Sequence, residues 1–179
     1  MMEASLQARL VQIKILLCDV DGILTDATVF MGATGEFKRF SILDGLGIAI
    51  LRREGVKVGW ISNRFSEATQ QRAKELKIDF LFQKSGSKID AARQILDELG
   101  LSFEQACYMG DDIVDVGLLQ LAGLAVSVPN GHPEAKAAAH YVTVAAGGHG
   151  AVREVVELIL KARNRWEEIV AEYARQGAH

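Results

Sequence analysis

The sequence contains little cysteine and little proline, with 2 of each among 179 residues. Two cysteines are too few for a disulfide framework, and Cys18 and Cys107 both lie in apolar runs, where we expect buried, reduced thiols. A composition of 49% hydrophobic and 24% charged residues excludes a disordered or collagen-like chain. We therefore expect a single folded domain over residues 1–179.

The sequence also lacks long apolar runs and an excess of positive charge. No segment approaches the roughly 20 apolar residues that a membrane-spanning helix needs, and no secretory signal is visible. Lys and Arg number 20 against 23 Asp and Glu, whereas a nucleic-acid-binding surface normally requires a basic excess or stripe. We therefore expect a cytoplasmic protein that binds neither membranes nor nucleic acids.

Short apolar segments alternate with helical patterns along the chain. This alternation predicts a doubly wound, Rossmann-like α/β fold with a parallel sheet covered on both faces. The expected strands are 13–18, 56–61, 79–82, 106–109, 124–128 and 141–144. The expected helices are 44–53, 66–77, 87–99, 115–122, 133–139 and 151–174. We expect Asp44 to be the N-cap of the first helix and the last helix to be long and amphipathic.

One segment, residues 27–41, interrupts this alternation between the first strand and the first helix. Two apolar stretches flank Gly32-Ala33-Thr34-Gly35, which predicts an inserted β-hairpin. An isolated hairpin is only marginally stable, so we expect its apolar side chains to contact neighbouring copies of the chain. These side chains are Val29, Phe30, Phe37 and Phe40. The alternative is that they pack on their own domain.

Polar side chains follow several of the expected strands, where such sheets carry their functional sites. They are Asp19, Asp21, Ser62, Asn63, Arg64, Lys88, Asp111, Asp112 and Asp115. Carboxylates this close cannot all ionise without compensation, and Mg²⁺ suits a site of carboxylate oxygens and water. Each group alone fits a turn, a helix cap or a solvated surface. Their order after successive strands predicts magnesium-dependent phosphoryl transfer.

The segments that carry these groups resemble the four motifs of the haloacid dehalogenase superfamily of phosphatases. The motifs are Asp19-Val20-Asp21-Gly22, Ser62, Lys88 and Gly110-Asp111-Asp112-Ile113-Val114-Asp115. The resemblance implies that Asp19 is a nucleophile forming an aspartyl-phosphate and that Asp21 is the general acid and base. Ser62 and Lys88 would hold the phosphoryl oxygens.

The same resemblance implies the metal site. Asp19, the backbone carbonyl of Asp21, and Asp111 would bind Mg²⁺. Asp112 would lie close behind Asp111 and contact the ion directly or through water. Asp115 would orient Lys88 or a metal-bound water.

Further segments resemble one branch of the superfamily, the 3-deoxy-D-manno-octulosonate 8-phosphate phosphatases of lipopolysaccharide precursor synthesis. They are Asp21-Gly22-Ile23-Leu24-Thr25-Asp26, the hairpin, Asp44-Gly45-Leu46-Gly47-Ile48 and residues 147–154. This resemblance implies a phosphorylated keto-sugar acid as substrate and a homotetramer whose neighbouring chains help close the site. Only 42 residues separate Asp19 from Ser62, and 25 separate Ser62 from Lys88, which leaves no room for a cap domain.

Two positions depart from the pattern of these relatives, which commonly have Gly at position 63 and Arg at position 149. Here they are Asn63 and His149. His cannot form two parallel hydrogen bonds to a carboxylate as Arg does, so Arg64 and Arg153 could supply the positive charge. The candidate substrate-binding residues are Asn63, Arg64, His149 and Arg153. A nonulosonate 9-phosphate therefore stays open as an alternative substrate. A non-catalytic oligomerisation module, like those fused to sugar cytidylyltransferases, is a further alternative.

Overall fold

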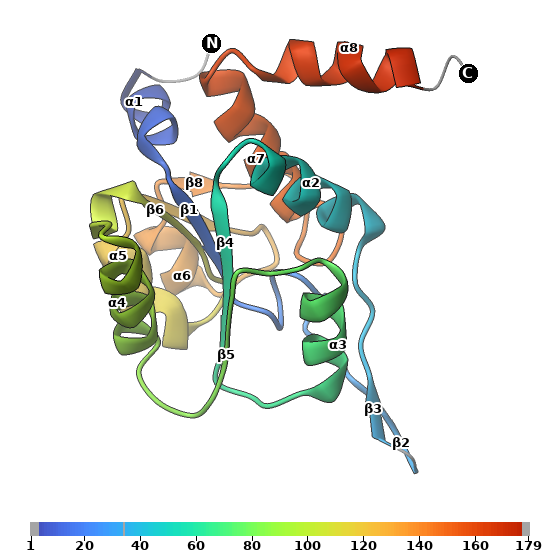
Figure 1. The fold of residues 1–179 in the computed structure, drawn as a ribbon. Coiled ribbons are helices and arrows are strands. Elements are labelled where there is room, and N and C mark those ends of the chain that lie inside the picture. Colours follow the sequence, from blue (N-terminus) through green and yellow to red (C-terminus); the bar gives the residue numbers. More distant parts are fainter. Residues whose placement is uncertain (1–3, 34, 177–179) are drawn as a thin grey trace.

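The structure, a computed structural model, describes residues 4–33 and 35–176 (Figure 1). Its centre is a six-stranded parallel sheet in the order β5-β4-β1-β6-β7-β8. The strands are β1 Ile15–Cys18, β4 Lys57–Ser62, β5 Phe80–Gln83, β6 Ala106–Met109, β7 Leu124–Ser127 and β8 Tyr141–Val142. The doubly wound fold is confirmed, and each expected strand is present with ends that differ by at most two residues.

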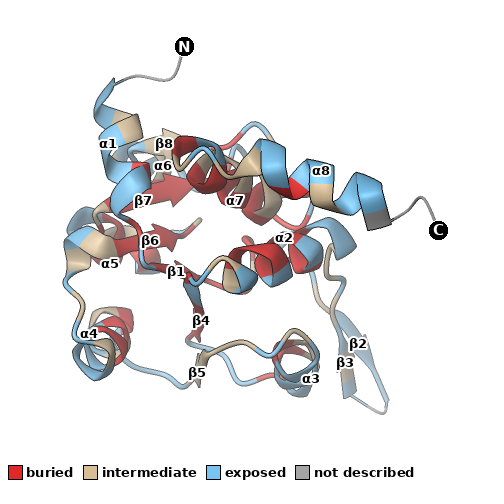
Figure 2. Cartoon of the chain, turned by 45° about the horizontal axis from the view of Figure 1, so that its top comes forward, coloured by how far each residue is buried: buried red, intermediate tan, exposed pale blue. Residues whose placement is uncertain are grey.

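Helices cover both faces of the sheet. They are α1 Ala4–Gln12, α2 Ile42–Arg53, α3 Glu67–Glu75, α4 Lys88–Leu99, α5 Val116–Leu121, α6 Pro133–Ala138, α7 Ala151–Ala162 and α8 Trp166–Gln176, with short 3₁₀ turns η1 Phe103–Gln105 and η2 Ile113–Asp115. Along β1, Leu16 and Cys18 belong to the core beneath α2 and α7, whereas Ile15 and Leu17 belong to the core beneath α4 and α5. Strands β1, β6 and β7 are accordingly buried along their whole length (Figure 2).

Several local expectations are confirmed and one helix was missed. Ser87 caps α4 through the amide of Asp90, and Gly100 ends that helix in a left-handed conformation with φ of 64°. Cys18 and Cys107 are buried and form no disulfide. Helix α1 was not predicted, and only Leu10 among its residues is buried. No helix within 4–33 and 35–176 is long and apolar enough to cross a membrane.

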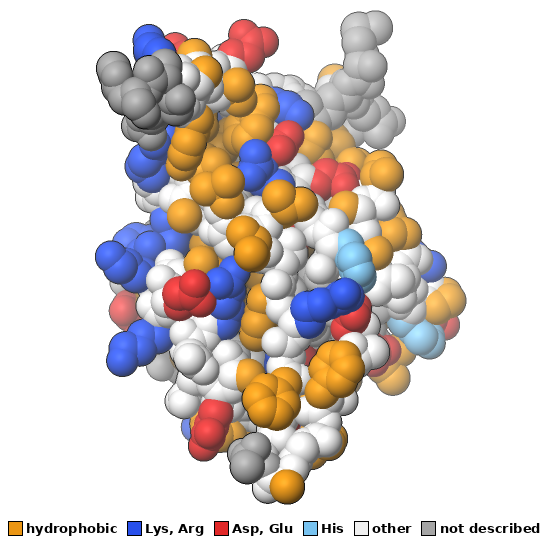
Figure 3. Space-filling view, turned by 90° about the vertical axis from the view of Figure 1, so that its right-hand side faces the viewer, with side chains coloured by type: hydrophobic (Ala, Val, Ile, Leu, Met, Phe, Trp, Pro, Cys, Tyr) orange, Lys and Arg blue, Asp and Glu red, His pale blue; other side chains and the backbone are white. Residues whose placement is uncertain are grey.

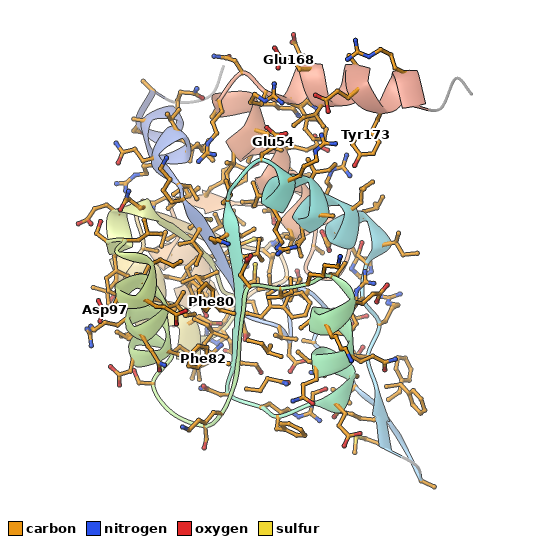
Figure 4. All side chains as sticks on the ribbon, in the orientation of Figure 1. Glu54, Phe80, Phe82, Asp97, Glu168 and Tyr173 are labelled. Carbon is orange, nitrogen blue, oxygen red and sulfur yellow. The ribbon has the colours of Figure 1, made fainter. Side chains whose placement is uncertain are left out.

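The expected helix 151–174 is instead two helices, so this prediction was wrong. Asn164 adopts a left-handed backbone with φ of 57°, which ends α7 and starts a new direction for α8. Arg165 then pairs with Glu54 at 2.9 Å, and the Arg53 guanidinium of α2 lies 5.5 Å from the centroid of the Tyr173 ring. Tyr173 points from α8 toward α2 (Figure 4). Both helices bury an apolar side against the same part of the molecule, so the periodicity continues across the break.

The expected N-cap role of Asp44 was also wrong. Ser41 caps α2, and its hydroxyl accepts a hydrogen bond from the Asp44 amide. The Asp44 carboxylate instead accepts from the backbone N–H of Arg153 at 2.8 Å, at the N-terminus of α7, where Gly150 offers no capping side chain. Burial raises the pKa of Asp44, against the opposing effect of the amides of Arg153, Gly150 and Val152. A side chain of α2 therefore caps α7, and this contact connects α2 to the N-terminus of α7.

The hairpin consists of β2 Phe30–Gly32 and β3 Gly35–Phe37 and projects from the body of the molecule (Figure 1). Phe30 and Phe37 face each other across the two strands and are 63% and 61% exposed. Phe40, by contrast, stacks on Trp60 with ring centroids 6.3 Å apart, so it packs on its own chain. A few separate hydrophobic side chains are exposed at this end of the molecule, the lower end in Figure 3. Position 34, in the turn, lies outside the described residues.

Candidate active site

The polar groups predicted at the strand ends meet because β1 lies between β4 and β6. Asp19 directly follows β1, and its amide donates to the carbonyl of Met109 at 2.9 Å. Lys88, the first residue of α4, places its Nζ 2.8 Å from Asp19 Oδ1. Both side chains are at least 90% buried, so this ion pair lies where water screens it little.

Asp115 organises the surroundings of Lys88. Its Oδ1 is 2.6 Å from Lys88 Nζ and accepts from the Tyr108 hydroxyl at 2.5 Å. Its Oδ2 accepts from the amides of Asp111 and Asp112 at 3.0 and 3.1 Å. Burial acts to lower the pKa of Lys88, but Asp19 and Asp115 outweigh it and raise that pKa above its ordinary value. The ammonium therefore stays charged between two carboxylates. The sequence analysis did not identify Tyr108 as part of the site. The only available signal was its position in β6, where alternate side chains face α4.

Asp111 completes a cluster of carboxylates. One oxygen from each of Asp19, Asp111 and Asp115 lies within 4.8 Å of the others. Burial, with Asp19 and Asp115 nearby, raises the pKa of Asp111 to about 8. Burial and Asp115, opposed by Lys88, raise the pKa of Asp19 to about 6.

Of these three carboxylates, Asp19 and Asp111 are the ones available to a cation. Both oxygens of Asp115 already accept hydrogen bonds. Asp111 Oδ1 is buried and has no hydrogen-bond partner in the described part of the chain. A buried carboxylate oxygen without a partner is costly, and a hard divalent cation is a ligand that would satisfy it.

Two glycines make the close packing beside Asp111 possible. Gly22 has φ of 101°, and a Cβ at this position would lie 2.0 Å from Asp111 Oδ2. Gly147 packs against the other side of the same turn, where a Cβ would lie 1.7 Å from the Gly22 carbonyl oxygen. The amide of Gly148 also donates to the carbonyl of Ile23 at 2.9 Å. The glycine loop before α7 therefore holds the turn that carries Asp19 and Asp21.

The carboxylates of Asp21 and Asp112 lie outside the cluster. Asp21 Oδ1 is 2.7 Å from Lys38 Nζ. Asp112 is exposed, and its Oδ1 accepts from the amide of Ile113 at 2.7 Å. The structure thus brings Asp19, Asp111 and Asp115 together, and it does not bring the carboxylate of either Asp21 or Asp112 to them. The part expected of Asp21 in metal binding was its backbone carbonyl, not its side chain.

Ser62, Asn63 and Arg64 lie at the end of β4. Ser62 is buried, and its Oγ accepts from the Arg64 amide at 3.1 Å. Asn63 is exposed and, with Ser62, lines a hollow of about 190 Å³ between β4 and α4. The Arg64 guanidinium pairs with Glu36 of the hairpin, so it faces the insertion.

His149 and Arg153, predicted together as substrate-binding groups, point in different directions. His149 Nδ1 lies 2.9 Å from the Gly147 carbonyl and therefore donates to it, so Nε2 accepts from Arg39 at 3.0 Å. Arg39 also pairs with Asp26 at 2.6 Å. Arg153 pairs with Glu157 at 2.9 Å and lies 5.1 Å from the centroid of the Trp166 ring. The structure therefore does not bring Arg153 to the cluster.

Comparison with known proteins gives consistent matches. A family model described as haloacid dehalogenase-like hydrolase matches residues 58–155. The chain is 40% identical over 160 residues to the 3-deoxy-D-manno-octulosonate 8-phosphate phosphatase of Yersinia pestis, covering 89% of this chain and 86% of that protein. It is 37% identical over 166 residues to the enzyme of the same name from Escherichia coli K12, covering 92% of this chain and 88% of the other.

Solved structures show the same similarity. The phosphatase of that name from Moraxella catarrhalis, in complex with magnesium, phosphate and a KDO molecule, matches with a TM-score of 0.91 and 38% identity over 94% of this chain and 97% of that one. The cobalt-bound deoxy-D-mannose-octulosonate 8-phosphate phosphatase of Haemophilus influenzae matches with a TM-score of 0.85 and 34% identity over 88% and 93%.

Proposed function

The chain belongs to the haloacid dehalogenase-like hydrolases and is a phosphoric monoester hydrolase; from this premise we propose that it is a Mg²⁺-dependent phosphatase of 3-deoxy-D-manno-octulosonate 8-phosphate. The observation that carries the proposal is the set of buried Asp19, buried Lys88 and half-buried Asp111 at the carboxyl edge of the sheet. A cytoplasmic reaction in lipopolysaccharide precursor synthesis is part of the proposal, and the two free thiols fit a reducing compartment.

The donor set fits magnesium. Asp19 and Asp111 are the side chains that would hold the ion, since Asp111 Oδ1 is buried without a partner in the described residues and an Asp19 oxygen lies in the same cluster. The backbone carbonyl of Asp21 is the third protein ligand proposed. When bound, Mg²⁺ supplies positive charge that neutralises the carboxylates and the transferring phosphoryl group.

The protein groups then divide the reaction between them. Asp19 attacks phosphorus and forms an aspartyl-phosphate while the bond to the sugar oxygen breaks. Asp21 donates its proton to that oxygen, and in the second step takes a proton from the water that attacks phosphorus and releases Asp19. Lys88 and Ser62 hold the phosphoryl oxygens, and Asp115 keeps Lys88 in place.

The sugar acid would lie over the open side of this site. Asn63, Arg64 and His149 remain the candidate contacts in this chain, with Arg64 near the hairpin and His149 supporting Arg39. Arg153 was the fourth predicted contact, and its guanidinium lies 5.1 Å from the Trp166 ring centroid, so it would have to leave that ring to reach the sugar acid.

The substrate is tested by measuring phosphate release from a panel of phosphorylated sugar acids with and without Mg²⁺. We expect kcat/KM to be highest for 3-deoxy-D-manno-octulosonate 8-phosphate and release to stop when the metal is chelated. A higher kcat/KM for a nonulosonate 9-phosphate would instead assign that alternative. If p-nitrophenyl phosphate and the sugar phosphates gave equal values, the proposed substrate would be wrong.

We also propose that the chain forms a homotetramer through the hairpins. Phe30 and Phe37 expose apolar rings side by side, and apolar surface of this kind is normally covered by a partner. Light scattering is expected to give a tetramer for the wild type and smaller species for Phe30→Ser combined with Phe37→Ser. As a control, Val144→Ser removes a side chain that is 87% exposed outside the hairpin. A hairpin variant that remained tetrameric would contradict this interface.

A further inference from the structure

We propose, given the phosphatase function proposed above, that Lys38 is a positioning residue that holds the carboxyl group of Asp21 in place to protonate the leaving alcohol. Lys38 directly follows β3 and lies in the inserted segment, which the four phosphatase motifs do not include. It contacts Asp21 rather than the reacting atoms, so its effect on the reaction passes through that side chain.

The contact is close and enclosed. Lys38 Nζ is 2.7 Å from Asp21 Oδ1, and the Lys38 side chain is 0% exposed. Nζ also lies 3.3 Å from the Thr69 hydroxyl of α3, which is itself fully buried. A buried ammonium is costly unless it has a polar partner, and its partner here is the Asp21 carboxyl group, which can carry its proton on the oxygen that Lys38 does not contact.

Asp21 has no comparable alternative anchor. Within residues 4–33 and 35–176, Lys38 is the only Lys, Arg or His with a nitrogen within 4.0 Å of the Asp21 carboxylate. The Asp21 side chain is 26% exposed, so part of it faces the open site. Asp21 Oδ1 makes no hydrogen bond in the described residues, so Lys38 holds it through this charge contact and leaves the other carboxyl oxygen accessible to a substrate.

Asp19 and Asp21 thus each contact a different lysine. Lys88 enters from α4 and binds Asp19, whereas Lys38 enters from the opposite side, next to α3, and binds Asp21. Two carboxyl groups that are two positions apart on the same turn thus contact different ammonium groups. The nucleophile lies in the buried cluster, and the proton donor lies toward the hairpin.

A comparison of substrates with good and poor leaving groups distinguishes two roles for Lys38. It either positions the general acid Asp21 or only supports the fold. A sugar alcohol is a poor leaving group and needs its proton during bond cleavage, whereas p-nitrophenolate leaves without one. The ratio kcat/KM reports events up to formation of the aspartyl-phosphate. Loss of Lys38 should therefore lower kcat/KM for the sugar phosphate and leave the aryl phosphate nearly unchanged.

The experiment compares Lys38→Met with wild type on the sugar 8-phosphate and p-nitrophenyl phosphate, using one preparation of the Mg²⁺-loaded protein. We expect kcat/KM to fall by about 10- to 100-fold for the sugar phosphate and by less than about 3-fold for the aryl phosphate. Thr69→Val should shift the same ratio in the same direction, but less. Lys57→Met is the matched control, because it removes a 3.1 Å pair with Asp79 at the N-terminal end of β4.

Equal loss on both substrates, or no loss on either, would overturn the role of Lys38. The ratio does not depend on the fraction of folded enzyme, and Thr69→Val supplies the same readout if Lys38→Met does not fold. Asp21→Asn on the same substrates separates this inference from the proposed function. If Asp21→Asn lowers kcat/KM only for the sugar phosphate and Lys38→Met does not, the role of Lys38 is wrong and the proposed function stands. If Asp21→Asn shows no selectivity, the acid role of Asp21 itself is wrong.

Discussion

Asp19→Asn is expected to lower kcat by about 10³-fold or more, because an amide oxygen cannot act as the nucleophile that accepts the phosphoryl group. Asn has nearly the same shape as Asp, and Lys88 keeps its contact with Asp115 at 2.6 Å, so the fold should be retained. Phosphate release and acid-quench trapping of labelled phosphoenzyme measure the effect. The wild type should form the labelled species and the variant should not.

The matched control for Asp19→Asn is Asp97→Asn. Asp97 is exposed on the outer side of α4, directed away from the sheet (Figure 4). This variant makes the same chemical change on the helix that carries Lys88, and we expect its kcat to match that of the wild type. A variant at position 19 that kept substantial activity would refute the assignment of the nucleophile.

Asp111→Asn is expected to have the second largest effect, which is an increase in the Mg²⁺ concentration that the enzyme needs for activity. Loss of groups that only support metal ligands typically costs 10- to 100-fold in metal affinity, so loss of a direct ligand should raise the half-activating Mg²⁺ concentration by about 100-fold or more. Asp112→Asn should change it much less, because the Asp112 carboxylate is occupied at the Ile113 amide. If the effects of the two substitutions were reversed, the metal ligand would be Asp112.

The same residue predicts how magnesium affinity changes with pH. Burial raises the pKa of Asp111 to about 8 in the metal-free protein, so this carboxyl is largely protonated at pH 7. A bound cation requires the ionised form and must displace that proton, so affinity should rise with pH until about pH 8. Calorimetry in buffers of different ionisation enthalpy should detect proton release from the wild type, and less from Asp111→Asn. Equal release from both proteins would exclude Asp111 as its source.

Local signals were sufficient for much of the site. Asp19 and Asp111 lie within two residues after a strand, Ser62 is the last residue of β4 and Lys88 begins α4. Parallel strands bring their carboxyl ends to one edge. The start of α4 illustrates the reason. Ser87 and Gly100 determine where this helix begins and ends, so the position of Lys88 depends on neighbours close in the sequence.

Contacts between distant segments were not predictable in this way. Asp44 has the side chain and spacing of an N-cap for its own helix, yet it caps α7, 109 positions away. The pairing of Lys38 with Asp21 depends on how the hairpin returns to the sheet beside α3. Arg153 looked like an anion-binding group beside the glycine loop, but helix geometry directs it to Trp166 of α8.

By itself the sequence determined the parallel sheet, the order of its motifs and the residue types that gather at its carboxyl edge, because strand periodicity, caps and turns depend on short-range interactions. Only the tertiary structure decided which carboxylates meet and which are drawn elsewhere. Asp19 and Asp111 belong to one cluster of carboxylates, while Asp21 contacts Lys38 and Asp112 accepts from a neighbouring amide. The direction of a carboxylate depends on the donors packed around it, and those donors come from segments far apart in the chain.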